Sequence, residues 1–113
     1  MPLSANELKL IREKYPHLQD YRSEDIDEPL DPLTFIDPTG DSLLHIAARA
    51  GDLVTVELLV RAGIDLDRVG DMGCTALHYA RMKKREDVYS FLVAHGASRL
   101  IRNEFGLLAD EAD

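Results

Sequence analysis

The side chains with the widest chemical scope are one cysteine and four histidines, namely Cys74, His17, His45, His78 and His95. A cysteine becomes a nucleophile when a neighbouring base takes its proton, and His78 follows Cys74 by four residues. A zinc site would group such side chains at close ligand spacing. No pair of the histidines shows that spacing together with a cysteine or a carboxylate, so the sequence predicts no metal site.

Two other kinds of chemistry find little support. Gly70 and Gly73 do not form a phosphate-binding loop or a dinucleotide motif. The carboxylates are numerous but scattered, so no acid/base pair can be singled out. The sequence therefore predicts no cofactor, and the pair of Cys74 and His78 is the one catalytic candidate to weigh.

The elements that carry these residues occur twice, 33 residues apart, in stretches that begin at Gly40 and Gly73. The matching pairs are Leu44-His45 with Leu77-His78, Ala47 with Ala80, Leu59 with Leu92, and Gly63 with Gly96. A third copy begins at Gly106 and soon stops. A period of about 33 residues around a T-P-L-H-x-A core is typical of ankyrin repeats. From about Asp37 onward, the sequence resembles the ankyrin repeat family.

The resemblance implies an all-α ankyrin-repeat solenoid with two full helix-turn-helix repeats joined by short finger turns. We expect an atypical N-terminal helical cap and acidic segment over residues 1–36 and a first repeat over 37–69. A second repeat is expected over 70–102, and a truncated capping repeat over 103–113. Each such unit cannot bury its apolar faces alone, and about three are usually needed for a stable stack.

Local signals support these boundaries. Gly40 suits a positive φ at a finger tip, and Ser42 stands where a hydroxyl caps a helix start. Gly51-Asp52 separates the two helices of the first repeat. In the second repeat Lys84 takes the place of this glycine, so we expect an awkward backbone angle there or a remodelled turn.

The N-terminus predicts a short amphipathic helix. Ser4 and Glu7 have the spacing of a capping box, and Ile11 and Tyr15 fall on one face. Pro16 ends the pattern, because the residue before a proline disfavours helical geometry.

Residues 20–41 hold eight acidic residues and one basic residue. Their apolar side chains predict a turn or short helix folded onto the first repeat, and a flexible acidic linker is the alternative. With only two complete repeats, we expect the N-terminal helix and residues 30–36 to form the first layer of the stack. The truncated third unit would close the other end.

Composition narrows the function classes. The chain has 113 residues with 21 acidic and 13 basic ones, a formal charge of -8, which argues against nucleic acid and favours a partner with a basic face. A single cysteine excludes an intramolecular disulfide and fits a reducing compartment. Charges interrupt every apolar run near the N-terminus, so we expect no signal peptide, no membrane contact and a cytoplasmic location.

The resemblance also assigns the histidines. At the positions of His45 and His78 the family uses the imidazole to bond backbone groups and link neighbouring fingers. His78 would then be unable to serve Cys74 as a base, and we predict a non-enzyme. His95 stands at a helix end, where a cation complements the helix dipole, and His17 has no evident partner.

In this family partners usually dock on the concave side, formed by finger tips and exposed positions of the first helices. The positions carried over are Asp41, Ile46, Arg49, Asp71, Met72, Cys74, Tyr79, Met82, Lys83, Glu104 and Phe105, with Pro38, Thr39, Ala50 and Leu107 around them. Apolar anchors with an acidic rim are typical of binding hot spots. Alternatively, Tyr79 and Met82 pack on the next finger. The basic run at residues 81–85 is either a local patch or a solvated helix end.

The sequence thus predicts a non-catalytic module that binds one partner protein through its concave surface. One alternative is an immunity protein, of a kind found among small acidic bacterial ankyrin proteins, that neutralises a basic, nuclease-like toxin. Another is a homo-oligomer that completes its own stack, so the expected state is a monomer or a weak homodimer.

Overall fold

A computed structural model describes residues 3–16 and 31–111. Its elements are the helices α1 (Ala5–Lys14), α2 (Leu43–Ala50), α3 (Leu53–Arg61), α4 (Ala76–Met82) and α5 (Glu86–Ala94), with the 3-10 turns η2 (Asp71–Gly73) and η3 (Ala109–Glu111). Within these ranges the one β feature is a single bridge between Ile36 and Ser42. The predicted all-α repeat fold is confirmed. His17 and much of the acidic segment lie outside the described residues.

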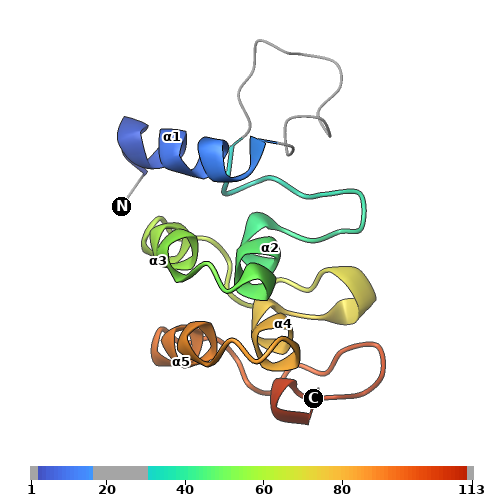
Figure 1. Cartoon of the computed structure of the whole chain (residues 1–113). Helices are drawn as coiled ribbons and strands as arrows, with labels where there is room; N and C mark the ends of the chain where they lie inside the picture. The colour runs from blue at the N-terminus through green and yellow to red at the C-terminus, as the bar shows by residue number, and fades with distance from the viewer. Residues whose placement is uncertain (1–2, 17–30, 112–113) are drawn as a thin grey trace.

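The helices form a stack of antiparallel pairs (Figure 1). α2 and α4 lie side by side in one layer, and α3 and α5 form the other. The connections into α2 and α4 project to one side as fingers, while α1 covers one end of the stack and η3 lies against α4 at the other. None of the helices in the described ranges is long and apolar enough to cross a membrane.

Side-chain caps start the inner helices, as expected. Ser42 accepts a hydrogen bond from the backbone N–H of His45 at the start of α2, and Thr75 does the same at α4. Gly51 ends α2 with a φ of 74°. Lys84 occupies the matching place after α4 with a φ of 59°, which confirms the awkward angle predicted from the sequence.

The core repeats with the sequence. Leu44 and Leu59 of the first pair, like Leu77 and Leu92 of the second, are almost completely buried. Small alanines at positions 47 and 80, also fully buried, let neighbouring helices approach closely.

The N-terminal helix caps this core. It begins at the predicted Ser4–Glu7 capping box, and its Ile11 and Tyr15 side chains are buried, as is Phe35 in the approach to the first finger. Tyr15 donates its hydroxyl proton to Asp52 at 2.8 Å, which ties α1 to the start of α3. Within the described residues, α1 and the approach to the first finger therefore cover this end of the stack, as expected of a first layer.

Replacing Lys84 by glycine is expected to stabilise the fold. A side chain in the left-handed region costs about 1–2 kcal/mol, and the added freedom of glycine in the unfolded chain offsets part of the gain. We expect a net gain in unfolding free energy of about 0.5–1 kcal/mol in urea titrations. Lys83→Gly removes the same charge at a φ of -96° and should bring no gain. Equal behaviour of the two variants would contradict the strain.

The Asp52 carboxylate is expected to make the fold acid-sensitive. Burial would raise its pKa, but hydrogen bonds from Thr55, Tyr15 and Lys14 outweigh burial and lower the pKa below 3.8. A lowered folded-state pKa adds stability that is present above the unfolded value and is lost as the pH falls through the folded value.

Asp52→Asn should therefore be less stable at neutral pH and lose less stability between about pH 6 and pH 3. Asp37, whose pKa is also lowered, supplies part of the remaining acid sensitivity. Tyr15→Phe keeps the Asp52 carboxylate but removes one of its donors. Its loss of stability on acidification should therefore lie between those of wild type and Asp52→Asn. Urea unfolding at both pH values measures the effect, and parallel losses in wild type and Asp52→Asn would refute it.

Candidate functional site: fingers and palm

Three fingers of the same construction line one side of the stack, at residues 37–41, 70–74 and 103–107. In each, the first residue donates its backbone N–H to the carbonyl of the fifth, at N···O distances of 2.9, 2.8 and 2.9 Å. The truncated third copy thus still provides a complete finger. We call the exposed surfaces of α2 and α4 beside the fingers the palm.

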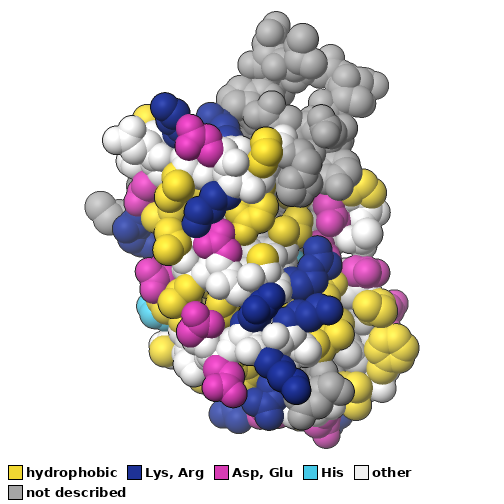
Figure 2. Space-filling model, viewed as in Figure 1, with side chains coloured by type: hydrophobic (Ala, Val, Ile, Leu, Met, Phe, Trp, Pro, Cys, Tyr) yellow, Lys and Arg dark blue, Asp and Glu magenta, His cyan; other side chains and the backbone are white. Residues whose placement is uncertain are grey.

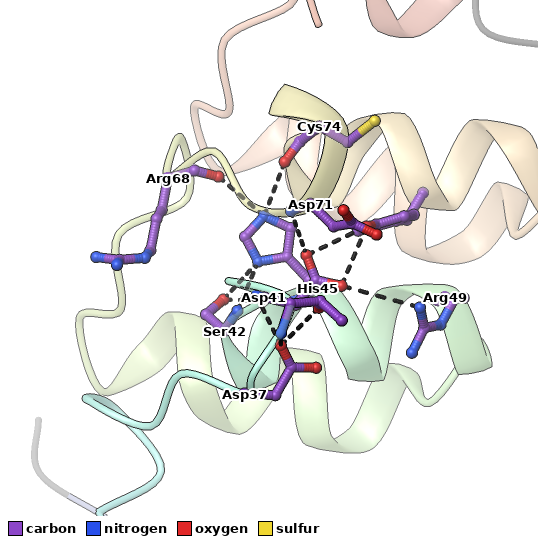
Figure 3. Close-up of polar contacts among 10 residues, drawn as sticks. Asp37, Asp41, Ser42, His45, Arg49, Arg68, Asp71 and Cys74 are labelled. Carbon is purple, nitrogen blue, oxygen red and sulfur yellow. Dashed lines mark hydrogen bonds and ion pairs between the residues drawn. The ribbon is translucent and has the colours of Figure 1, made fainter. Parts of the chain in front are cut away.

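The His45 side chain links the first repeat to the second finger (Figure 3). Its Nδ1 accepts the backbone N–H of Ser42 at 3.0 Å, so the proton of the neutral ring sits on Nε2. Nε2 lies 3.0 Å from the carbonyl oxygens of both Arg68 and Cys74 and donates to them. Burial, the largest influence, lowers the pKa of His45 and keeps the ring neutral.

His78 repeats this arrangement one finger further on. Its Nδ1 accepts the N–H of Thr75 at 3.1 Å, and its Nε2 donates to the carbonyl of Leu107 at 2.9 Å. Both ring nitrogens are therefore engaged with the scaffold, which confirms the predicted role of the two histidines. The Nδ1 lone pair of His78 is engaged by the Thr75 N–H, so His78 is not placed to activate Cys74.

Asp41 joins the first finger to the second and is only 1% exposed. It accepts the N–H of Asp71 at 2.9 Å, and the Arg49 guanidinium lies 3.8 Å away (Figure 3). It also accepts the hydroxyl of Tyr79 at 3.0 Å. Gly70 makes room for it, since a Cβ there would lie 2.2 Å from Asp41 Oδ1. The buried Asp41 carboxylate therefore connects the first finger to the second finger and to α4.

Three of the predicted contact residues are therefore corrected. Asp41, Cys74 and Tyr79 are 1%, 1% and 3% exposed, too buried to meet a partner. The Tyr79 ring stands edge-on to His45 of α2 at 5.7 Å, and its hydroxyl bonds Asp41 of the first finger, so Tyr79 packs on the preceding repeat and not on the next finger. Burial raises the pKa of the Cys74 thiol, which disfavours the reactive thiolate.

The finger tips carry the most prominent apolar side chains of this surface. Thr39, Met72 and Phe105 occupy equivalent tip positions, and the last two are 38% and 68% exposed. The carbonyl of Met72 accepts the N–H of Glu104 at 3.0 Å, so the second and third tips are adjacent. Met72 holds a φ of 57°, a left-handed conformation that is unusual for a long side chain.

The remaining predicted contacts lie around these tips and on the palm. Those that stay at least partly exposed are Ile46, Arg49, Asp71, Met72, Met82, Lys83, Glu104 and Phe105. With Asp41 buried, the predicted acidic rim shrinks to Asp71 and Glu104, while the palm exposes the cations Arg49 and Lys83. Apolar tips, a small acidic rim and a basic palm can bind a protein surface.

Nothing in the described ranges adds metal chemistry, since they contain no group of three or more His, Cys, Asp or Glu side chains that could hold an ion. Sequence reasoning did miss one hollow, a pocket of about 360 Å³ lined by Ala80, Arg81, Lys84, Glu86, Tyr89 and Ser90. The basic run 81–85 was the available signal. Its proximity to residues of α5 depends on how the helices pack.

Comparison with known proteins agrees with this geometry. The family model "Ankyrin repeats (3 copies)" matches residues 13–103, more than half of the chain, and the chain belongs to the ankyrin repeat family. Members of this fold act as interaction modules, and ankyrin repeats generally bind protein partners.

Among curated proteins the chain is similar to protein phosphatase 1 regulatory subunit 27 of Homo sapiens, with 35% identity over 79 residues. The match covers 70% of this chain and 51% of the relative, and the Mus musculus protein matches equally. The probable 26S proteasome regulatory subunit p28 of Saccharomyces cerevisiae is 37% identical over 71 residues, covering 61% of this chain and 31% of that protein. The chain thus spans about half or less of these relatives.

The burial of Tyr79 generates a prediction about stability. Tyr79→Phe leaves the buried Asp41 carboxylate without the hydroxyl, which should lower the unfolding free energy by about 1–3 kcal/mol. Tyr89→Phe is the matched control, because its hydroxyl bonds Asp110 at the surface and should cost less. Chemical denaturation compares the two. A Tyr79→Phe variant as stable as wild type would show that the carboxylate does not depend on this bond.

Proposed function

We propose that this protein is a non-catalytic binding protein that holds a partner protein through its fingers and palm. The observation that carries the proposal is the pair of adjacent finger tips bearing Met72 and Phe105, both exposed. Large apolar side chains within a polar rim supply most of the energy of protein interfaces.

The backbone conformation of Met72 also supports a binding role for the finger tips. A left-handed conformation at a long side chain costs about 1–2 kcal/mol, and such strain tends to occur at functional sites. In the equivalent position of the first finger, Thr39 is not among the residues with a positive φ. Phe105 at the third tip also lacks a positive φ, so among the three tips the strained backbone is particular to Met72.

The support beneath the tips is rigid. The fingers are joined through buried bonds of His45, His78 and Asp41. A surface ordered before binding loses less conformational entropy on association, so more of the contact energy appears as affinity.

The relatives suggest the kind of role. All three relatives described above are named regulatory subunits, and by analogy this chain would act by occupying part of another protein. Asp71 and Glu104 beside the tips would suit basic groups of that partner. A cytoplasmic location fits the single cysteine.

The two narrower versions of the function remain hypotheses. Inhibition of a basic toxin would use the acidic residues 20–41, which lie largely outside the described ranges. Completion of the stack by a second copy would give a stable oligomer in light scattering. The binding-protein proposal instead requires a monomer or a weak homodimer.

The role of the tips can be tested by capturing the partner from an extract. Phe105→Ala should greatly reduce recovery of a partner that wild-type protein captures and mass spectrometry identifies, and in the purified pair it should cost about 1 kcal/mol or more of affinity. Val54→Ala removes an exposed apolar side chain from α3, on the other layer, and should bind like wild type. Binding lost in Val54→Ala and retained in Phe105→Ala would place the site on that other layer.

A further inference from the structure

The last helix pair has an outer face that the first pair does not expose. In the first repeat the following pair covers this face, so that Ala48 and Val56 are fully buried and the Arg85 side chain packs on Gly51. The equivalent residues of the second repeat are Arg81, Tyr89 and Lys84. They line the pocket of about 360 Å³ between α4 and α5.

Cationic side chains gather beside this pocket. Figure 2 shows Lys and Arg side chains over α4 and the turn toward α5, on the face of the molecule turned to the viewer. Lys83, Lys84 and Arg85 are exposed, and neither lysine forms an ion pair within the described residues. Arg85 Nε donates to the backbone carbonyl of Arg49 at 3.2 Å, which holds the Arg85 side chain against the end of α2.

Acidic groups around the pocket neutralise part of this charge and leave the charges of Lys83 and Lys84 without an ion pair within the described residues. Glu86 lines the pocket, and it is the one carboxylate among the lining residues. Asp110 of η3 is held by the Tyr89 hydroxyl and by Arg99, whose guanidinium lies 2.7 Å away, and it also interacts electrostatically with Arg81. In a chain of formal charge -8, this edge is therefore locally positive.

The inner wall adds features of a recognition site. The Arg81 guanidinium lies over the Tyr89 ring at 5.7 Å, which orients it beside the pocket. Ser90 supplies a hydroxyl that can donate to an anion.

The backbone conformation of Lys84 also supports a binding site here. The matching turn of the first repeat uses glycine at a φ of 74°, whereas Lys84 holds a long cationic side chain at 59°. A polar end of the stack needs only solubility, and glycine would provide the turn without strain. A lysine in a conformation that favours glycine is better explained by a use for its charge.

We propose that this pocket and the adjoining edge of residues 83–85 bind an acidic segment of a partner protein, with carboxylates directed at Lys84 and Arg81. Acidic motifs are commonly recognised by such basic clusters. A second copy of this chain is a poorer occupant, because two positive faces would repel each other. The pocket is separate from the finger tips, although Lys83 at its edge also belongs to the palm. Its binding of an acidic peptide is tested without the partner of the proposed function.

The probe is a synthetic peptide of about ten glutamates, compared with a glutamine peptide of the same length, titrated into the isotope-labelled full chain. We expect saturable NMR shifts of the backbone amides within residues 81–90 with the glutamate peptide alone. Lys84→Asn, which tolerates the left-handed angle, should weaken binding at least fivefold, and Lys84→Arg should restore it. Lys9 is an exposed residue of α1, so Lys9→Gln removes the same charge elsewhere and should bind like wild type.

Thermal unfolding shows that each variant is folded before its affinity is read. The proposal is overturned if Lys84→Asn binds the glutamate peptide within twofold of wild type, or if Lys9→Gln weakens binding equally. Shifts centred on the finger tips instead of residues 81–90 would also overturn it. Concentration-dependent shifts of the same amides without peptide would assign the face to a second copy and reject the acidic segment.

Discussion

The buried polar bonds between successive fingers are the constraint on which the rest of the structure depends. Each finger is a five-residue turn that has no core of its own. His45 and His78 hold the next finger by donating from Nε2 to its backbone carbonyls, and this requires a proton on that nitrogen. The backbone N–H groups of Ser42 and Thr75 donate to Nδ1 of these rings, so the donated proton is the one on Nε2. One local motif thus caps a helix and positions a finger 29 residues away.

Asp41 adds a second bond of this kind and explains an irregularity of the repeat. Asp37 and Asn103 open their fingers with side chains that accept N–H groups of the same finger. The equivalent residue of the second finger is Gly70, which has no side chain to do this. The Asp41 carboxylate from the first finger occupies that space and accepts the N–H of Asp71. A buried carboxylate is tolerable there because its donors compensate for lost hydration.

With the fingers secured from within, the surface is free to vary. The tips and the outer face of the last pair hold side chains that the scaffold does not need, and two of them, Met72 and Lys84, occupy left-handed backbone positions. A strained backbone conformation persists only where the surrounding structure holds it in place. The hydrogen bonds of the fingers do this for Met72, and the ends of the helices do it for Lys84. The same rigidity that makes the repeat stable makes these exposed side chains suitable for recognition.

The sequence by itself determined the helices, their caps, the repeat period and the roles of His45 and His78, because these depend on local spacing and on a pattern that recurs. It also anticipated the backbone angle at Lys84, since a glycine position occupied by lysine is visible in aligned repeats. Only the tertiary structure decided which side chains are exposed. Asp41 and Tyr79 meet across 38 residues, and their burial follows from the approach of two fingers, which periodicity does not encode. The pocket beside Arg81 likewise depends on where the stack of described helices ends, a property of packing between repeats.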